Sequence, residues 1–141
     1  MKLLLLFLFV GSVAAVSRFE SMVVHVNVIL RCKHPWGTDA KVFLMESDYE
    51  MNFIDDDDVL DFTNYPLGNV PPPVVSLHGE EFEFFGIEPY LHITHACSGK
   101  RDNWTTVTVP LIDKMFKSRI FNVVIDLESG KQTIHQRLMY P

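Results

Sequence analysis

The sequence predicts an all-β domain of about eight short strands, arranged as a sandwich or a barrel. Apolar residues alternate with a period of two in several segments, which is the pattern of half-buried strands. Turn-forming residues separate these segments at short intervals, and no segment carries the pattern of a long amphipathic helix. Residues 110–118 could form one or two helical turns, because Pro110 suits a helix start.

The first residues predict a secretory signal peptide. Met1-Lys2 is followed by an apolar run at 3–10 and then by small residues, with cleavage expected after Ala15. The run is shorter than the roughly 20 residues that span a bilayer, so we expect no transmembrane segment. A buried N-terminal strand is the weaker alternative. Residues 16–141 are then expected to be one secreted, extracellular domain. The sequence is acidic overall, so it lacks the clustered positive charge that is typical of nucleic-acid-binding proteins.

The expected strands are rich in β-branched and aromatic residues. In the first of them the even positions from Met22 to Leu30 are apolar, and Val42 and Leu44 face the core from the second. In a late strand the inward residues are Phe121, Val123, Ile125 and Leu127. In chain order the expected strands cover residues 22–31, 41–47, 58–63, 74–79, 90–97, 104–110, 119–129 and 131–140.

A proline-rich segment at 68–74 is expected to be an extended, exposed connection, because its prolines cannot belong to a central strand. The two cysteines, Cys32 and Cys97, form an even pair in a chain expected to be secreted, which favours one disulfide. Closing so long a loop contributes roughly 4 kcal/mol in the chain-entropy model.

The stretch "EPYLHITHAC" at 88–97 brings together His92, His95 and Cys97. On a strand, His95 and Cys97 share the apolar, inner face and His92 takes the other face, so the three cannot converge on one metal ion. We expect His95 to be half-buried and bonded to a backbone or hydroxyl group, and His92 to be exposed. The stretch is therefore interpreted as framework, with no metal or catalytic role.

Each of three expected surface features has two possible interpretations. The aspartates at 55–58 could bind calcium, but they lack the spacing of an EF-hand loop and more often mark a solvated turn. Asn103 heads an Asn-Trp-Thr sequon and is expected to be glycosylated, with an unmodified loop asparagine as the alternative. The basic residues Lys100, Arg101, Lys114, Lys117 and Arg119 could meet an anionic membrane or be solvated surface.

No cofactor motif, phosphate-binding glycine loop or catalytic triad spacing is present in the sequence, so we expect no cofactor and no enzymatic activity.

The order of features from about Val24 to about Leu127 resembles the nematode transthyretin-like family. A strand ending in "LRC" at Cys32 is followed by "KVFLMESD", "DDDDVL" and Thr63. The stretch 86–97 then matches the family signature Pro-Tyr-Leu-x-Ile-x-His-x-Cys at Pro89, Tyr90, Leu91, Ile93, His95 and Cys97. The chain departs from the family between Thr63 and Gly79, where it inserts "NYPLGNVPPPV" at 64–74.

The resemblance implies an immunoglobulin-like, two-sheet sandwich of transthyretin type with about seven to eight strands. It assigns Pro89, Tyr90 and His95 to the framework. A few members of the family are associated with exposed phosphatidylserine and with cell-surface receptors. The expected function is therefore a secreted binding module for a cell-surface lipid, such as an anionic head group, or for an extracellular protein.

Two alternatives remain at this point. A small hydrophobic-ligand carrier would require an assembled oligomer. A 5-hydroxyisourate-type hydrolase is disfavoured because those enzymes end in a Tyr-Arg-Gly-Ser-type tail, whereas this chain ends "RLMYP".

Overall fold

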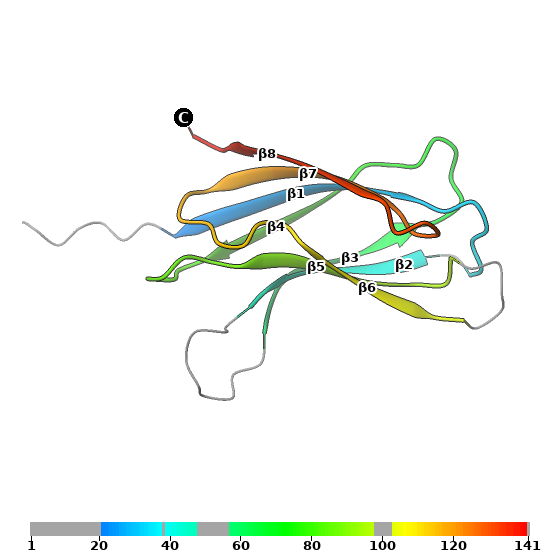
Figure 1. The fold of residues 1–141 in the computed structure, drawn as a ribbon, viewed down its shortest axis with the longest axis horizontal. Helices are drawn as coiled ribbons and strands as arrows, with labels where there is room; N and C mark the ends of the chain where they lie inside the picture. Colours follow the sequence, from blue (N-terminus) through cyan, green and yellow to red (C-terminus); the bar gives the residue numbers. More distant parts are fainter. Residues whose placement is uncertain (1–20, 38, 48–56, 98–102, 141) are drawn as a thin grey trace, which may run out of the picture.

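The computed structural model describes residues 21–37, 39–47, 57–97 and 103–140. Figure 1 shows these residues as two β-sheets packed in two layers. No helix in these ranges is long and apolar enough to cross a membrane. The predicted signal peptide, Asp55, Asp56, Lys100 and Arg101 lie outside the described residues.

Each sheet has four strands. The first sheet has the order β4-β1-β7-β8, in which β1 pairs antiparallel with β4 and parallel with β7. The second has the order β3-β2-β5-β6 and is antiparallel throughout. The strands are β1 (Met22–Arg31), β2 (Asp39–Glu46), β3 (Asp58–Pro66), β4 (Val75–Glu81), β5 (Pro89–His95), β6 (Thr105–Pro110), β7 (Arg119–Asp126) and β8 (Gln132–Leu138). The predicted eight-strand sandwich with one disulfide is therefore confirmed.

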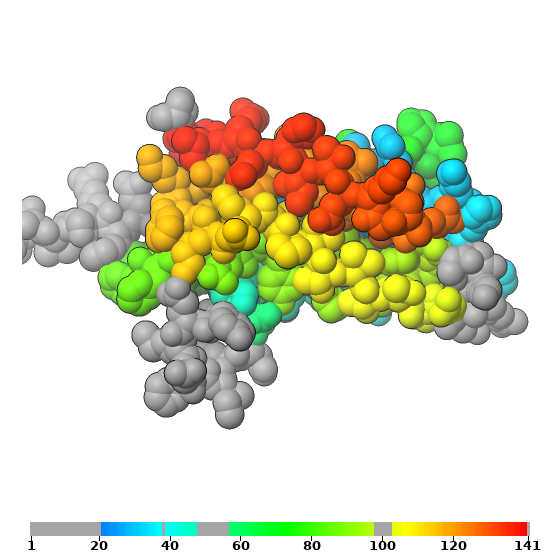
Figure 2. Space-filling model, viewed as in Figure 1, coloured from blue at the N-terminus to red at the C-terminus, as the bar shows by residue number. Residues whose placement is uncertain are grey.

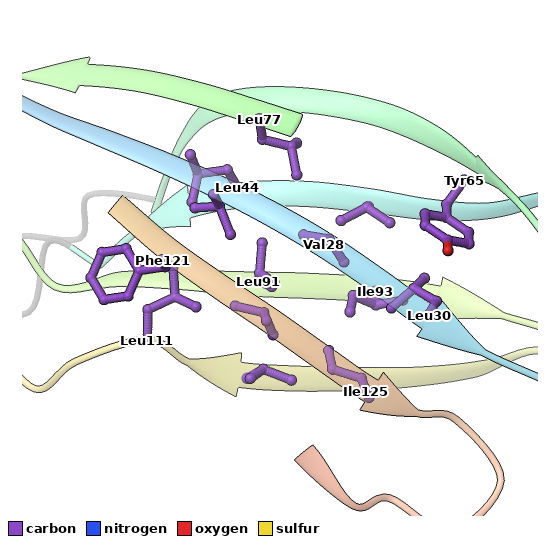
Figure 3. Close-up of a cluster of buried hydrophobic side chains, with 14 of the residues drawn as sticks. Val28, Leu30, Leu44, Tyr65, Leu77, Leu91, Ile93, Leu111, Phe121 and Ile125 are labelled. Atoms are coloured by element: carbon purple, nitrogen blue, oxygen red, sulfur yellow. The ribbon is translucent and has the colours of Figure 1, made fainter. Parts of the chain in front are cut away.

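The core lies between the sheets, where the inward faces of both interdigitate (Figure 3). In β1 the even positions are buried and the odd positions between them are partly exposed, as the period-two pattern predicts. Burying each large aliphatic or aromatic side chain contributes about 1.5–3 kcal/mol. The largest fully buried apolar side chains are Tyr65, Phe121, Leu30, Leu44, Leu77, Ile87, Leu91, Ile93, Met115 and Ile125.

One disulfide joins the two sheets. Cys32 follows β1 in the first sheet and Cys97 follows β5 in the second, with their Cα atoms 5.8 Å apart. The Trp36 amide donates a hydrogen bond of 2.9 Å to the Ala96 carbonyl beside this bridge. Together these contacts fix the end of the sandwich that we call the disulfide end.

The predicted helical turns at 110–118 are wrong. Pro110 is the last residue of β6, and Met115 forms an isolated bridge with Ile87. The Ile87 amide donates to the Met115 carbonyl at 3.0 Å, and the Met115 amide donates to the Ile87 carbonyl at 2.9 Å. A helix as short as residues 110–118 would be stabilised little by its own hydrogen bonds, because helix nucleation is unfavourable. Pairing with a distant backbone satisfies these groups and buries Met115.

The segment taken as an insertion at 64–74 is partly strand. Residues 64–66 complete β3, and Tyr65 is fully buried in the core. Its hydroxyl donates a hydrogen bond of 2.6 Å to the Pro73 carbonyl, and burial raises the pKa of the phenol. The rest of the segment is the predicted connection, and Val70 at its tip is 94% exposed.

The strands β3 and β4 approach closely at one side of the sandwich, where Gly79 permits the contact. Gly79 is buried, and a Cβ added there would lie 2.7 Å from Cβ of Leu60 and 3.3 Å from Cδ2 of Leu44. No Cβ fits at such distances unless one strand moves. Gly79 is therefore required by packing.

Gly79→Ala should lower the free energy of unfolding by about 1–3 kcal/mol, because the added methyl overpacks the β3–β4 contact. Urea unfolding followed by fluorescence would measure this change. Gly130→Asn is a suitable control, since no atom lies within 4 Å of its added Cβ and asparagine tolerates the positive φ of 72°. An alanine variant as stable as the wild type would contradict the packing argument.

Candidate functional site

The structure separates the histidines of the 88–97 stretch. His95 is 3% exposed on the inner face of β5, and its Nδ1 accepts a hydrogen bond of 3.1 Å from the Cys97 amide. His92 points to the other face, where its ring lies 6.1 Å from that of Phe43. The expected backbone bond of His95 is confirmed, whereas half-burial is wrong, because the residue is almost fully buried.

The disulfide and a neighbouring carboxylate form a cluster that is unsuited to metal binding. Cys32, Cys97 and Glu128 place one potential ligand atom each within 4.8 Å of one another. The two sulfurs are bonded to each other at 2.06 Å, so neither is a thiolate. Glu128 already interacts with His34, whose Nδ1 lies 2.7 Å from its carboxylate.

Tyr90, which was expected to be a framework residue, joins β5 to the acidic segment. Its hydroxyl donates a hydrogen bond of 2.5 Å to Oδ2 of Asp57. Desolvation raises the pKa of Tyr90 to about 12, and the negative charges of Asp57 and Glu46 add to this rise. Pro89 is buried beside it at the start of β5. Asp57 and Asp58 are exposed, and calcium binding by the acidic run remains a prediction.

An open groove of about 630 Å³ lies next to Tyr90. Its lining includes Asp57, Glu88, His92 and Ile112. Asp57 accepts the Tyr90 hydrogen bond, and Glu88 pairs with Lys114 at 3.3 Å. These carboxylates are thus engaged in structural contacts, and we assign the groove no chemistry.

Exposed aromatic side chains gather at the end of the sandwich opposite the disulfide. Three of them follow β4, one lies between β6 and β7, and one follows β8. We call this surface the aromatic end. It consists of Phe82 (41% exposed), Phe84 (66%), Phe85 (58%), Phe116 (65%) and Tyr140 (74%).

The aromatic end is assembled by the Ile87–Met115 bridge. Figure 2 shows the green 82–86 connection and the orange residues near 116 side by side at the left of the molecule. Gly86, with a φ of 86°, lets the two segments touch, because an added Cβ would lie 2.8 Å from both the Met115 carbonyl oxygen and Cε1 of Phe116. The rings of Phe82 and Phe84 meet edge to face, with centroids 5.3 Å apart.

The same end holds a shallow pocket and a mixture of charges. The pocket has a volume of about 270 Å³ and is lined in part by Phe116, Lys117 and Tyr140. Glu80 is exposed at the end of β4, and Glu81 and Glu83 are partly exposed beside the phenylalanines. Carboxylates therefore lie beside the phenylalanines that follow β4, and Lys117 is exposed next to Phe116.

The predicted glycosylation site and the predicted basic residues at 114–119 lie at opposite ends of the sandwich. Asn103 is exposed just before β6, near the disulfide end, whereas Lys117 belongs to the aromatic end. Arg119 lies in β7, where it donates a hydrogen bond of 3.1 Å to Gln136. Lys114 pairs with Glu88 at 3.3 Å, and a role of the basic residues at a membrane remains a prediction. The aromatic end was not predicted from the sequence, although the run "FEFF" at 82–85 between two expected strands indicates an exposed aromatic segment.

The comparison with known proteins indicates the same family as the sequence signature at residues 86–97, the transthyretin-like family. The chain is 33% identical over 105 residues to "Transthyretin-like protein 1" of Caenorhabditis elegans. The match covers 70% of this chain and 64% of that protein, so the chain spans less than two thirds of its relative. No protein-family model matches the sequence, and no solved structure matches it significantly.

Acid is expected to destabilise the fold through His95. Burial lowers the pKa of its imidazole, so the unfolded chain binds a proton more readily than the folded protein. The free energy of unfolding should therefore fall as the pH drops below the unfolded-state pKa of about 6.5. Above that pH the imidazole is neutral in both states and this penalty is absent.

Urea unfolding at about pH 7.5 and about pH 5 tests this effect. His95→Asn keeps an acceptor oxygen near the position of Nδ1 and removes the titration, so its stability should fall less between the two pH values. The stability of the control variant His92→Asn, altered at a partly exposed histidine on the other face of β5, should fall as much as that of the wild type. An unchanged fall in His95→Asn would exclude His95 as the acid-sensitive group.

Proposed function

Because this chain is a transthyretin-like β-sandwich protein, we propose that it is an extracellular binding module and that the aromatic end is its contact surface. The supporting observation is the exposure of four phenylalanines and one tyrosine at one end of the sandwich. Exposed apolar clusters on soluble proteins mark interaction sites, and aromatic residues are enriched at the centres of protein interfaces.

The partner that fits best is a protein surface with basic residues. Glu80 and Glu81 precede the phenylalanines that follow β4, and Glu83 lies between two of them, so a complementary surface carries positive charge beside an apolar centre. An anionic membrane would be repelled by these carboxylates. Phosphatidylserine is the alternative ligand, and the exposed Lys117 beside Phe116 is the feature that favours it.

Secretion is part of this proposal. A disulfide persists in oxidising compartments, and the apolar N-terminal sequence has the composition of a signal peptide. A binding role without enzymatic activity is consistent with a fold that places His95, Tyr90 and the cysteines in structural contacts. A ligand carrier would instead require an oligomer, which size-exclusion chromatography with light scattering would detect.

The binding test compares the labelled full chain with a Phe84→Ser/Phe116→Ser variant on intact cells of the producing species. Loss of two central aromatic anchors should weaken binding by more than about tenfold. Val70→Ser, altered at the disulfide end, should bind like the wild type. Circular dichroism would verify that each variant is folded.

Two further arms identify the ligand class. Loss of binding after protease treatment of the cells supports a protein partner. Flotation of the chain with vesicles containing phosphatidylserine, but not with neutral vesicles, would favour the lipid instead. Wild-type cell binding that the double variant retains would contradict the role of the aromatic end.

Glycosylation of Asn103 remains a prediction that the exposed sequon supports. Protein from a eukaryotic host should migrate faster on a gel after treatment with a peptide N-glycosidase. The Asn103→Gln variant should show the faster mobility without treatment. Identical mobility of untreated wild type and variant would show that the site is unoccupied.

A further inference from the structure

The outer face of the sheet β4-β1-β7-β8 carries a polar row that the aromatic end does not use. His25 and Asn27 occupy odd positions of β1 and point away from the core. In the register of the sheet, His25 lies opposite His78 of β4, and Asn27 lies opposite both Ser76 of β4 and Asn122 of β7. Five polar side chains are thus adjacent on three neighbouring strands.

A hydrogen-bond network orients the His25 ring. The Asn27 amide nitrogen donates a hydrogen bond of 2.9 Å to Oδ1 of Asn122, and the Ser76 hydroxyl donates one of 2.7 Å to Oδ1 of Asn27. Oδ1 of Asn27 is therefore an acceptor. Nε2 of His25, 3.2 Å from this oxygen, donates to it. In the neutral ring Nδ1 then carries the lone pair.

This arrangement has the form of a histidine prepared for a metal ion. Metal-binding histidines donate their second ring N–H to a carbonyl or carboxylate oxygen, which fixes the tautomer and the orientation of the ring. Asn27 supplies such an oxygen to His25. Two neighbours on other strands hold Asn27 in place, so the orientation does not depend on one flexible side chain.

The distance between the rings of His25 and His78 is close to the distance that two imidazoles need to share one metal ion. The ring centroids of His25 and His78 lie 6.1 Å apart. With metal–nitrogen bonds of 2.0–2.1 Å and tetrahedral angles, two imidazoles on one zinc ion have centroids about 5 Å apart. His78 is exposed, so rotation of its side chain can close the difference.

Carboxylates beside His78 favour a cation at this position. Oδ2 of Asp61 accepts a hydrogen bond of 2.8 Å from the His78 amide, which places a negative charge next to the strand. Glu80 lies two residues further along the same face of β4. Neither is required as a ligand, because water can complete the coordination.

We propose that His25 and His78 form a binding site for a divalent transition-metal ion of the Zn²⁺ or Cu²⁺ class. Imidazole nitrogen is a preferred ligand of both ions, and Cu²⁺ binds more tightly than Zn²⁺ in most such sites. Asn27 is a positioning residue that acts through His25. The two histidines lie on the outer face of the sheet, whereas the aromatic side chains lie at the ends of the strands.

Isothermal titration calorimetry of the full chain with ZnCl₂ and with CuCl₂ tests the site. The wild type should bind one ion saturably at this pair near pH 7.5, and acid should weaken binding because the imidazoles must be neutral. His25→Gln and His78→Gln should each abolish this binding event. Asn27→Ala should retain it with about 10- to 100-fold lower affinity, as expected for loss of an orienting hydrogen bond.

His135→Gln is the matched control on the same face, since His135 lies opposite Asn122 and not opposite His25. It should bind like the wild type. In an NMR experiment Cu²⁺ should broaden the ring signals of His25 and His78 before those of other histidines. Absence of saturable binding by the wild type, or wild-type affinity in His78→Gln, would overturn the proposal.

Discussion

The pairing of β1 on both of its sides is the constraint from which the molecule is built. Its register with β4 and β7 sends the even residues from Met22 to Leu30 into the core and the odd residues, including His25 and Asn27, to the outer face. A slip of one residue would exchange these two sets. The hydrophobic interior and the histidine pair on the surface are therefore two results of one alignment, and neither can change without the other.

Much of this architecture could be predicted from the sequence, because period-two alternation is a local property of each strand. All eight strands were expected close to their observed limits, and the even cysteine count predicted the bridge between Cys32 and Cys97. The failures share a cause. One or two helical turns were considered for residues 110–118, yet Met115 bonds to the distant Ile87. The third strand was expected to end at residue 63, yet Tyr65 belongs to β3 and is buried in the core. Contacts between residues far apart in the sequence decided both.

The candidate sites were harder to predict for the same reason. For the stretch at 88–97, alternation alone predicted that His92 and His95 lie on opposite faces of the strand, and the structure confirms this. The aromatic end depends on the meeting of two connections and the chain terminus, and the histidine pair depends on the register of β1 against β4. Single-sequence patterns define which face a residue occupies, but not which residue of another strand lies opposite it.

The hydrogen bond from Tyr65 to the Pro73 carbonyl has a practical consequence for labelling the protein. It anchors the base of the 67–74 connection to the core, so the exposed tip at Val70 is mechanically separate from the packing beneath it. That tip lines one pocket with Cys32 at the disulfide end, so it lies at the opposite end of the sandwich from the aromatic end. A fluorophore or affinity tag attached there would leave the aromatic end free, and immobilisation through it would present that end to solution.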